Sequence, residues 1–442
     1  MSNTNKAPKS GFMKKGVMIV GLRLAGAVLA YALVVLLARW LDADSYGYYS
    51  LIMSAITFGS VLSKLGADLS IVRFLGVYRA EEKPALAAGA VRTALISVLV
   101  LTLVIGLVAA GVLAVFPGIV GQPLAFALAA LLIFPAFGLT DVLSGIIRSY
   151  GGAFLALAPK DVLWRIGLIA AAWAIAAMNV PHDQRLIWVI ILSGVFLTGF
   201  TGIQFLAQKK LRLVKDGQVE TPEFDRPAWK QSAVWTWSLA SARTSFRTLD
   251  VITVGVILSP AAAGAYFAAS RSAELLSFLL SAVNMIVGPA VARGTAKGDI
   301  KETQKKLSLV AALLASTVPV FGVVFVVWGR EILGFVSPAF VEAYPAMLIL
   351  AVGHAVNVLV GSAGVVLNMT GNERTNSLIL MTSVPISLVL LPILGAQFGM
   401  TGVAIAMTTG LIVLNVRTYV ATRRLTPYDP SVTGIRFLLG RK

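Results

Sequence analysis

The chain has 442 residues, of which 57% are hydrophobic and 13% charged, and its mean hydropathy is +0.85. An ordinary soluble domain carries about 25% charged residues, so this composition excludes a soluble globular protein. The absence of cysteine excludes disulfides and thiolate metal sites, and the net charge of +17 lies mostly between apolar runs, which indicates membrane topology rather than nucleic-acid binding.

Twelve apolar runs follow one another along the chain, each long enough to predict a transmembrane helix. The runs are 17–38, 47–65, 86–116, 124–147, 162–178, 186–205, 233–258, 264–291, 307–327, 345–369, 378–396 and 400–420. The first run is too long for the core of a signal peptide and lacks a small-residue cleavage site, so it is predicted to remain as a helix. The predicted fold class is therefore all-α, a polytopic membrane bundle of about 12 transmembrane helices.

Basic residues between the runs predict how the bundle is oriented. The two tails and every second gap hold 26 Lys and Arg residues, whereas the other gaps hold only Arg39, Arg185 and Arg330. Because basic loops are retained on the cytoplasmic side, both termini are predicted to be cytoplasmic. The predicted location is the bacterial inner membrane, crossed many times.

A polar stretch at 208–231, between the sixth and seventh runs, predicts a division of the chain into two halves. It is rich in charged residues and contains Pro222 and Pro227, a composition typical of a linker. The predicted parts are an N-terminal six-helix lobe at 1–207, a cytoplasmic linker at 208–231, a C-terminal six-helix lobe at 232–420 and a cytoplasmic basic tail at 421–442.

The two halves also repeat each other in sequence. At an offset of 217 residues, Gly47 aligns with Gly264 and Tyr49 with Tyr266, each pair at the connection after the first helix of its half. The two helices run in the same direction, so a parallel repeat about an axis along the membrane normal is predicted. Transporters have this architecture, and the substrate site is expected between the halves.

Short motifs spread over nearly the whole chain carry a resemblance to a known family. They are LARWL at 37–41, YGYYS at 46–50, GADLSIVRF at 66–74, Asp250, GAYFAASR at 264–271 and NMTGN at 368–372. In these motifs the chain resembles the polysaccharide transporter branch of the multidrug/oligosaccharidyl-lipid/polysaccharide flippase superfamily. That branch includes the O-antigen and exopolysaccharide repeat-unit flippases.

The resemblance implies a function and a set of partners. It implies a V-shaped bundle of two lobes around a cationic cavity that carries a polyprenyl-pyrophosphate-linked oligosaccharide by alternating access, from the cytoplasmic to the periplasmic leaflet. Membrane lipids, a polysaccharide polymerase and other assembly proteins are the implied partners. Two features distinguish the chain from other members of the superfamily. Lipid II flippases usually have fourteen helices, whereas about 12 are predicted here. Cation-coupled drug exporters often carry a carboxylate in the first helix, where this chain has Arg23.

Ionisable side chains inside the apolar runs are costly in a bilayer and therefore informative. With a rise of about 1.5 Å per residue, Arg243, Arg247 and Asp250 lie roughly 15, 21 and 26 Å from the cytoplasmic end of the seventh helix. Arg271 and Glu274 of the eighth helix lie at similar depths. Asp250 is predicted to pair with Arg271. Glu274 is predicted to pair with Arg247 or Arg243, which leaves one arginine over.

Arginine suits a pyrophosphate because its planar guanidinium donates two parallel hydrogen bonds and keeps its proton. Predicted substrate-binding residues are therefore Arg23, Arg243, Arg247 and Arg271, and the predicted ion-pair or coupling residues are Asp250 and Glu274. Two alternatives stay open: Arg23 snorkels to the cytoplasmic headgroups, and the other arginines only lock two helices together.

No catalytic constellation is found in the sequence, so no enzyme, cofactor or metal is predicted. His182 and His354 lie far apart in the chain, and no glycine-rich phosphate loop with its lysine occurs. His354 is expected to be a packed, hydrogen-bonded histidine, and Asp141 a solvated group near a membrane edge. The basic and apolar end of the tail, 434–442, is expected to lie on the inner leaflet or to be disordered. The alternative functions are a cation-coupled multidrug exporter of the same fold and a membrane scaffold of a polysaccharide assembly complex.

Overall fold

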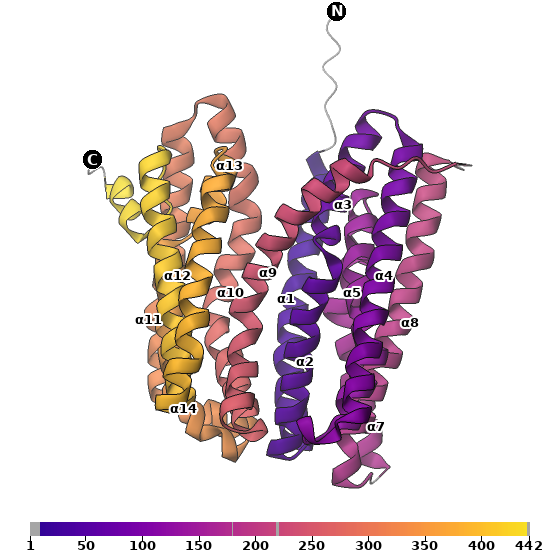
Figure 1. Ribbon diagram of the computed structural model, residues 1–442. Helices are drawn as coiled ribbons and strands as arrows, with labels where there is room; N and C mark the ends of the chain where they lie inside the picture. The colour runs from indigo at the N-terminus through magenta and orange to yellow at the C-terminus, as the bar shows by residue number, and fades with distance from the viewer. Residues whose placement is uncertain (1–8, 179, 218–220, 440–442) are drawn as a thin grey trace, which may run out of the picture. The chain divides into compact units, whose positions relative to one another are not determined.

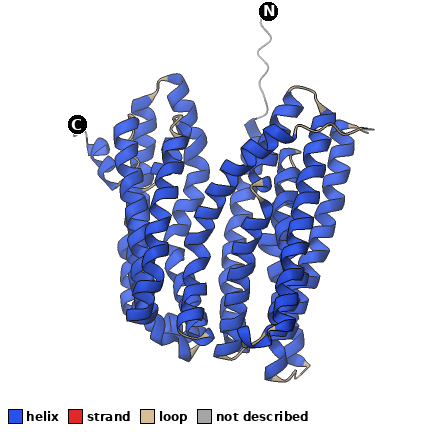
Figure 2. Cartoon of the chain, viewed as in Figure 1, coloured by secondary structure: helices blue, strands red, loops and turns tan. Residues whose placement is uncertain are grey.

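The computed structural model describes residues 9–178, 180–217 and 221–439, and this part of the chain is helical apart from short connections (Figures 1 and 2). The helices are α1 (Lys9–Trp40), α2 (Ala43–Lys64), α3 (Ala67–Ala80), α4 (Pro84–Val115), α5 (Pro123–Ser149), α6 (Ala153–Ala158), α7 (Trp164–Ala177), α8 (His182–Asp216), α9 (Arg226–Ile257), α10 (Pro260–Lys297), α11 (Ile300–Val336), α12 (Tyr344–Val360), α13 (Ala363–Met369) and α14 (Glu373–Leu425). Short segments of tighter or wider helix are η1 (Pro117–Ile119), η2 (Pro159–Leu163), η3 (Pro338–Ala343) and η4 (Val432–Leu439). The predicted all-α fold class is confirmed.

Eight of the described helices are long and apolar enough to cross a membrane, or nine if the bent pair of α2 and α3 forms one span. Helix α14 counts once among them, although it has 53 residues and leaves the helical conformation at Gly399, where φ is 60°. That break falls between the predicted runs 378–396 and 400–420, so α14 consists of two helices. The chain is a multi-pass membrane protein.

The described residues form two compact units, and the first consists of the chain up to Leu41 together with Ala55–Ser241. Its central helix is α5, which packs against α3, α4 and α8. Side chains such as Ile133 and Ile146 of α5 are fully buried there. At the start of α9, the indole Nε1 of Trp229 donates a hydrogen bond of 2.8 Å to the Tyr78 hydroxyl, which ties α9 to α3 in this unit.

The second unit consists of Asp42–Ser54 and the described residues from Ala242 onward. Its central helix is α10, which packs against α11, α12 and α13, while α12 also packs against α14. The buried start of α10 is rich in alanine and glycine, and these small side chains allow close helix packing. The unit boundaries inside α2 and α9 differ from the lobe boundaries predicted at 207/208 and 231/232.

The glycines that align at the offset of 217 residues pack against each other in the second unit. A Cβ added to Gly47 would lie 1.9 Å from the carbonyl oxygen of Pro260, and one added to Gly264 would lie 3.1 Å from the Gly47 nitrogen. A side chain at position 47 would overlap the Pro260 backbone, and one at position 264 would be tightly packed against Tyr46 and Gly47. The start of α2 and the start of α10 therefore approach each other at equivalent positions of the sequence repeat.

Most of the described residues in the segment predicted as a linker are helical. Helix α8 continues to Asp216 and α9 begins at Arg226, so both ends of 208–231 are helical. Between the helices, the Glu223 amide donates a hydrogen bond of 3.1 Å to the Ala85 carbonyl. This contact attaches the connection to the start of α4.

The tail after α14 folds back onto the second unit. The Gln304 side chain of α11 donates to the Asp429 carbonyl and accepts from the Asp429 amide, both at 2.8 Å. Tyr428 is only 1% exposed and packs with Val287 and Leu307 in a hydrophobic core. Disorder was one of the two expectations for 434–442, and it is wrong for the described residues 434–439. These belong to η4, and the Gly434 carbonyl accepts a hydrogen bond of 2.7 Å from the Ser308 hydroxyl.

Candidate functional site

The turn between α9 and α10 brings two charged helix segments side by side. Ser259 caps α10, because its hydroxyl accepts a hydrogen bond of 3.1 Å from the Ala262 amide, and Pro260 starts the helix. Only two residues separate α9 from α10, so the two helices return along each other. The second half of α9 therefore faces the first half of α10.

Glu274 is the centre of the charged cluster of the second unit. Its Oε1 accepts from Arg247 at 2.5 Å, and its Oε2 accepts from Arg271 at 2.6 Å. Arg247 comes from α9, whereas Arg271 lies one turn before Glu274 on the same face of α10. One carboxylate thus serves two guanidinium groups, and the predicted pairing of Glu274 with Arg247 is present.

The predicted pair of Asp250 and Arg271 does not form a salt bridge, although Arg271 is close enough to interact electrostatically with Asp250. Asp250 is 2% exposed, its carboxylate accepts from the Val251 amide at 2.8 Å, and it forms no salt bridge in the described part of the chain. Tyr266 lies beside it. Arg271 pairs with Glu274 instead because that carboxylate is one helical turn away on the same face.

Arg243 supplies charge that no carboxylate balances. It is exposed, lies one turn before Arg247 on α9, and has neither a salt bridge nor a hydrogen bond among the described residues. Arg243, Arg247, Arg271 and Glu274 therefore form a cluster of three guanidinium groups and one carboxylate. We call this group the arginine cluster.

A polar stripe continues from the arginine cluster along α10. Ser277 lies one turn beyond Glu274, and its hydroxyl is 2.9 Å from Nδ1 of His354 on α12. The amide of Asn357, one turn further along α12, donates to the same hydroxyl at 3.2 Å. The expectation of a hydrogen-bonded His354 is confirmed. Farther along α10, the buried Oδ1 of Asn284 has no hydrogen-bond partner in the described residues.

The first unit contains a second charged cluster, which the sequence analysis missed. The two carboxylate oxygens of Asp141 accept from Lys64 and Lys160, each at 2.6 Å, and Lys64 also lies 3.3 Å from Asp68. The Lys160 ammonium stands 3.6 Å from the centre of the Phe137 ring. We call Lys64, Asp68, Asp141 and Lys160 the lysine cluster. Asp141 is therefore not the solvated group near a membrane edge that was expected. The sequence contained one signal for this cluster, because Lys64 lies inside the predicted apolar run 47–65.

Arg23 belongs to the first unit, whereas the arginine cluster belongs to the second. It is exposed on α1 and forms no salt bridge among the described residues. Arg148, at the end of α5, is close enough to interact electrostatically with it. The Arg148 Nε donates to the Ser144 carbonyl at 3.3 Å. Arg148 is thus a further candidate for a substrate-binding cation. It was not predicted because it lies directly after the run 124–147, and only charges inside the runs were selected.

Comparison with known proteins gives a family and a fold. A family model described as "Polysaccharide biosynthesis protein" matches residues 12–295. No curated protein sequence matches the chain. Among solved structures, the chain is similar to an inward-facing multidrug resistance MATE family transporter of the MOP superfamily, with 12% identity, a TM-score of 0.72 and coverage of 92% of this chain and 97% of the other.

Two further solved structures share the fold. The lipid II flippase MurJ in an inward closed conformation is 13% identical, with a TM-score of 0.68 over 96% of this chain and 91% of the other. A MOP superfamily transporter from Pyrococcus furiosus, whose description reports a binding pocket of reverse polarity, is 12% identical, with a TM-score of 0.61 over 93% and 95%. At these identities the likeness concerns the fold.

Proposed function

Because this chain belongs to the polysaccharide biosynthesis protein family, whose model matches residues 12–295, we propose that it is a flippase of polyprenyl-pyrophosphate-linked oligosaccharides. It carries each repeat unit from the cytoplasmic to the periplasmic leaflet of the bacterial inner membrane, by alternating access, for surface polysaccharide synthesis. Both termini are cytoplasmic, and a polysaccharide polymerase with other assembly proteins receives the product.

The observation that carries this proposal is the surplus of guanidinium in the arginine cluster. Arg247 and Arg271 share Glu274, and Arg243 has no carboxylate of its own among the described residues. A charged side chain at mid-membrane depth costs about 2.5–3.5 kcal/mol, which an anionic ligand offsets. The pyrophosphate of a lipid-linked sugar supplies that anion at membrane depth, with oxygens spaced for bidentate guanidinium contacts.

The polar stripe supports the sugar part of the proposed substrate. Ser277, His354 and Asn357 present hydroxyl, imidazole and amide groups within about two helical turns of Glu274. Such groups both donate and accept hydrogen bonds, as sugar hydroxyls do. In our proposal the pyrophosphate lies on the arginines and the first sugar lies along this stripe.

The test is transport by the purified full chain in vesicles that contain a labelled lipid-linked oligosaccharide. We expect the label to move between leaflets, and polyprenyl pyrophosphate to inhibit this movement where uncharged polyprenol does not. Equal inhibition by the two lipids would contradict a role for the pyrophosphate. Running the assay with and without a pH or sodium gradient identifies the energy source, since Asp250, Glu274 and His354 are the candidate proton carriers.

The two alternative functions give other results. A cation-coupled multidrug exporter changes the drug susceptibility of cells when it is deleted, and its transport is indifferent to polyprenyl pyrophosphate. A membrane scaffold of a polysaccharide assembly complex moves no labelled lipid, and it tolerates neutral residues in the arginine cluster provided that the protein is still abundant.

A further inference from the structure

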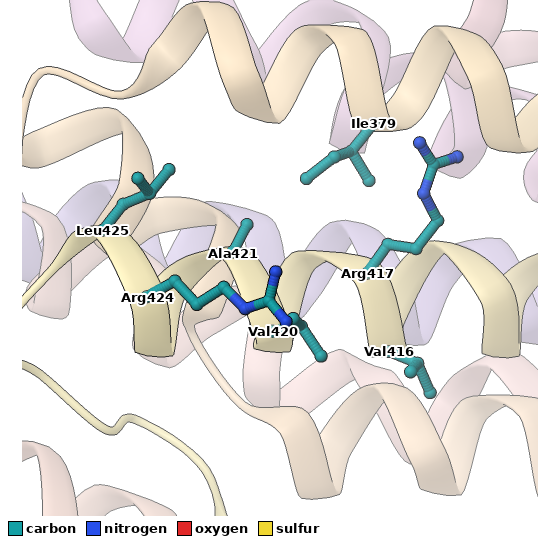
Figure 3. A pocket seen from close by; sticks show the side chains of 7 residues that line it. All are labelled: Ile379, Val416, Arg417, Val420, Ala421, Arg424 and Leu425. Atoms are coloured by element: carbon teal, nitrogen blue, oxygen red, sulfur yellow. The ribbon is translucent and has the colours of Figure 1, made fainter.

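A shallow groove of about 390 Å³ lies along the last turns of α14 in the second unit (Figure 3). Its walls include Ile379 from the first leg of α14, and Val420 and Ala421 from the second leg. Two arginines, Arg417 and Arg424, complete the lining, and no acidic residue takes part in it. The groove is therefore apolar along its walls and positively charged at its rim.

In the part of the chain that the structure describes, neither arginine of the groove forms a salt bridge. Arg417 donates one hydrogen bond of 3.2 Å to the Ser383 hydroxyl, which leaves most of its donors unused. Arg424 has no salt bridge or hydrogen bond among the described residues. The neighbouring Arg423 differs, because it lies 3.1 Å from the buried carboxylate of Asp429. Of the two adjacent arginines, only the one in the groove has its charge unbalanced.

The spacing of the two arginines places both on the groove. They are seven residues apart, which puts them on one face of the helix with about 10 Å between their Cα atoms along the axis. Figure 3 shows the Arg424 side chain running back along the helix to lie beside Val420, while the Arg417 side chain rises toward the leg that carries Ile379. Both guanidinium groups thus border the same apolar walls.

The depth of the groove matches the inner edge of the bilayer. Arg424 is the penultimate residue of α14, in the predicted cytoplasmic headgroup region, and Arg417 lies about 10 Å deeper. Cytoplasmic leaflets are rich in anionic lipids, and basic side chains at this level attract them. The acyl chain of such a lipid descends from the headgroup into the hydrocarbon, where the apolar walls are.

We propose that this groove is a binding site for an anionic glycerophospholipid of the cytoplasmic leaflet. Arg417 and Arg424 hold the phosphate, and one acyl chain lies along Ile379, Val420 and Ala421. The absence of any acidic lining residue favours a lipid with a net negative charge over a zwitterionic one, whose ammonium group would meet the same two arginines. The site is separate from the arginine cluster. It rests on the proposed cytoplasmic orientation of the termini but does not require flippase activity.

The test compares lipids retained by the purified full chain in native mass spectrometry. The chain is exchanged into mixed micelles with equal amounts of phosphatidylglycerol and phosphatidylethanolamine, matched in acyl chains. The variants are Arg417→Gln, Arg424→Gln and the double variant. Arg293→Gln is the matched control, because it removes the same charge from an exposed position of α10 outside the groove.

Wild type and Arg293→Gln are expected to retain phosphatidylglycerol preferentially, and each groove substitution to lower that preference about fivefold. An equal preference in wild type and the double variant would overturn the proposal, as would the absence of a preference in wild type. A competition with added polyprenyl phosphate tests whether the groove prefers the phosphate of an isoprenoid lipid to that of a glycerophospholipid. If polyprenyl phosphate displaces phosphatidylglycerol at a lower concentration, in an Arg417-dependent way, the groove docks the isoprenoid lipid instead and the proposal fails.

Discussion

The lysine cluster of the first unit and the arginine cluster of the second unit differ in charge balance and in exposure. The lysine cluster has two ammonium and two carboxylate groups, and its Lys64 side chain is 5% exposed. The arginine cluster has three guanidinium groups and one carboxylate, and its Arg247 side chain is 62% exposed. One cluster is balanced and buried, whereas the other is positive and open.

The type of cation explains part of the difference. Each oxygen of Asp141 accepts from one ammonium group, and a compact ammonium is satisfied by a few such contacts. A guanidinium has five donors, so Arg247 and Arg271 retain donors after each has bound one oxygen of Glu274. We therefore expect disruption of the lysine cluster to destabilise the first unit, whereas the arginine cluster has donors left for an anion.

The largest expected effect is on stability in the lysine cluster. Asp141→Asn leaves two buried ammonium groups without their shared carboxylate and is expected to lower the free energy of unfolding by about 3 kcal/mol. Thermal unfolding of the detergent-solubilised protein and its abundance in the membrane measure this loss. Adding Lys160→Met to the same chain should restore part of the stability. A single variant as stable and abundant as wild type would show that the cluster is not structural.

A smaller effect, on binding instead of stability, is expected at Arg243. Arg243→Ala should weaken binding of a pyrophosphate lipid by about 1.5–3 kcal/mol, the contribution of a charge-assisted hydrogen bond. Its thermal midpoint should stay at the wild-type value, because Arg243 has no partner to lose among the described residues. Arg243→Lys should restore binding only in part, since lysine lacks the bidentate geometry. Arg374→Ala, at an exposed position of the same unit, is the control. Normal binding by Arg243→Ala would leave helix locking as the function of the cluster.

Removing the shared carboxylate of the arginine cluster should cost less than removing Asp141. Glu274→Gln is expected to lower the free energy of unfolding by about 1 kcal/mol, because the exposed Arg247 is solvated and its attraction to Glu274 is screened. The same variant should bind pyrophosphate more tightly, since the cluster gains net positive charge. Isothermal titration with polyprenyl pyrophosphate measures this change. Weaker binding would indicate that Glu274 orients the arginines instead of competing with the ligand.

Only a small effect on stability is expected at Arg23. Arg23→Ala should change the free energy of unfolding by less than about 0.5 kcal/mol, as do most substitutions of exposed side chains. It also removes a like charge from Arg148, so any change should be stabilising. Transport then separates the two interpretations of Arg23. Reduced transport at normal stability supports a phosphate contact, and unchanged transport supports snorkelling to the headgroups.

The apolar pattern of the sequence determined the fold class, because lipid requires that each spanning segment satisfy its own backbone hydrogen bonds. The spanning segments could therefore be predicted as helices from the sequence alone. The break at Gly399 also agrees with the sequence, because it lies between two predicted runs. The same logic selected Arg243, Arg247, Arg271 and Glu274, since a charge inside an apolar run is visible without a structure. Depth along neighbouring helices limited the partner of Glu274 to Arg247 or Arg243, and the structure shows that it is Arg247.

Only the tertiary structure decided the partners that depend on helix rotation and on distant contacts. Depth alone predicted a pair between Asp250 and Arg271, but Arg271 pairs with Glu274, one turn away on the same helix, and Asp250 is buried beside Tyr266. The lysine cluster joins residues 64, 141 and 160, which come from three separate helical segments. The contact between the tail and α11 could not be predicted either, because Gln304 and Asp429 are 125 residues apart in the chain. A sequence fixes how deep a side chain lies in the membrane, whereas the neighbour it meets at that depth depends on how the helices pack.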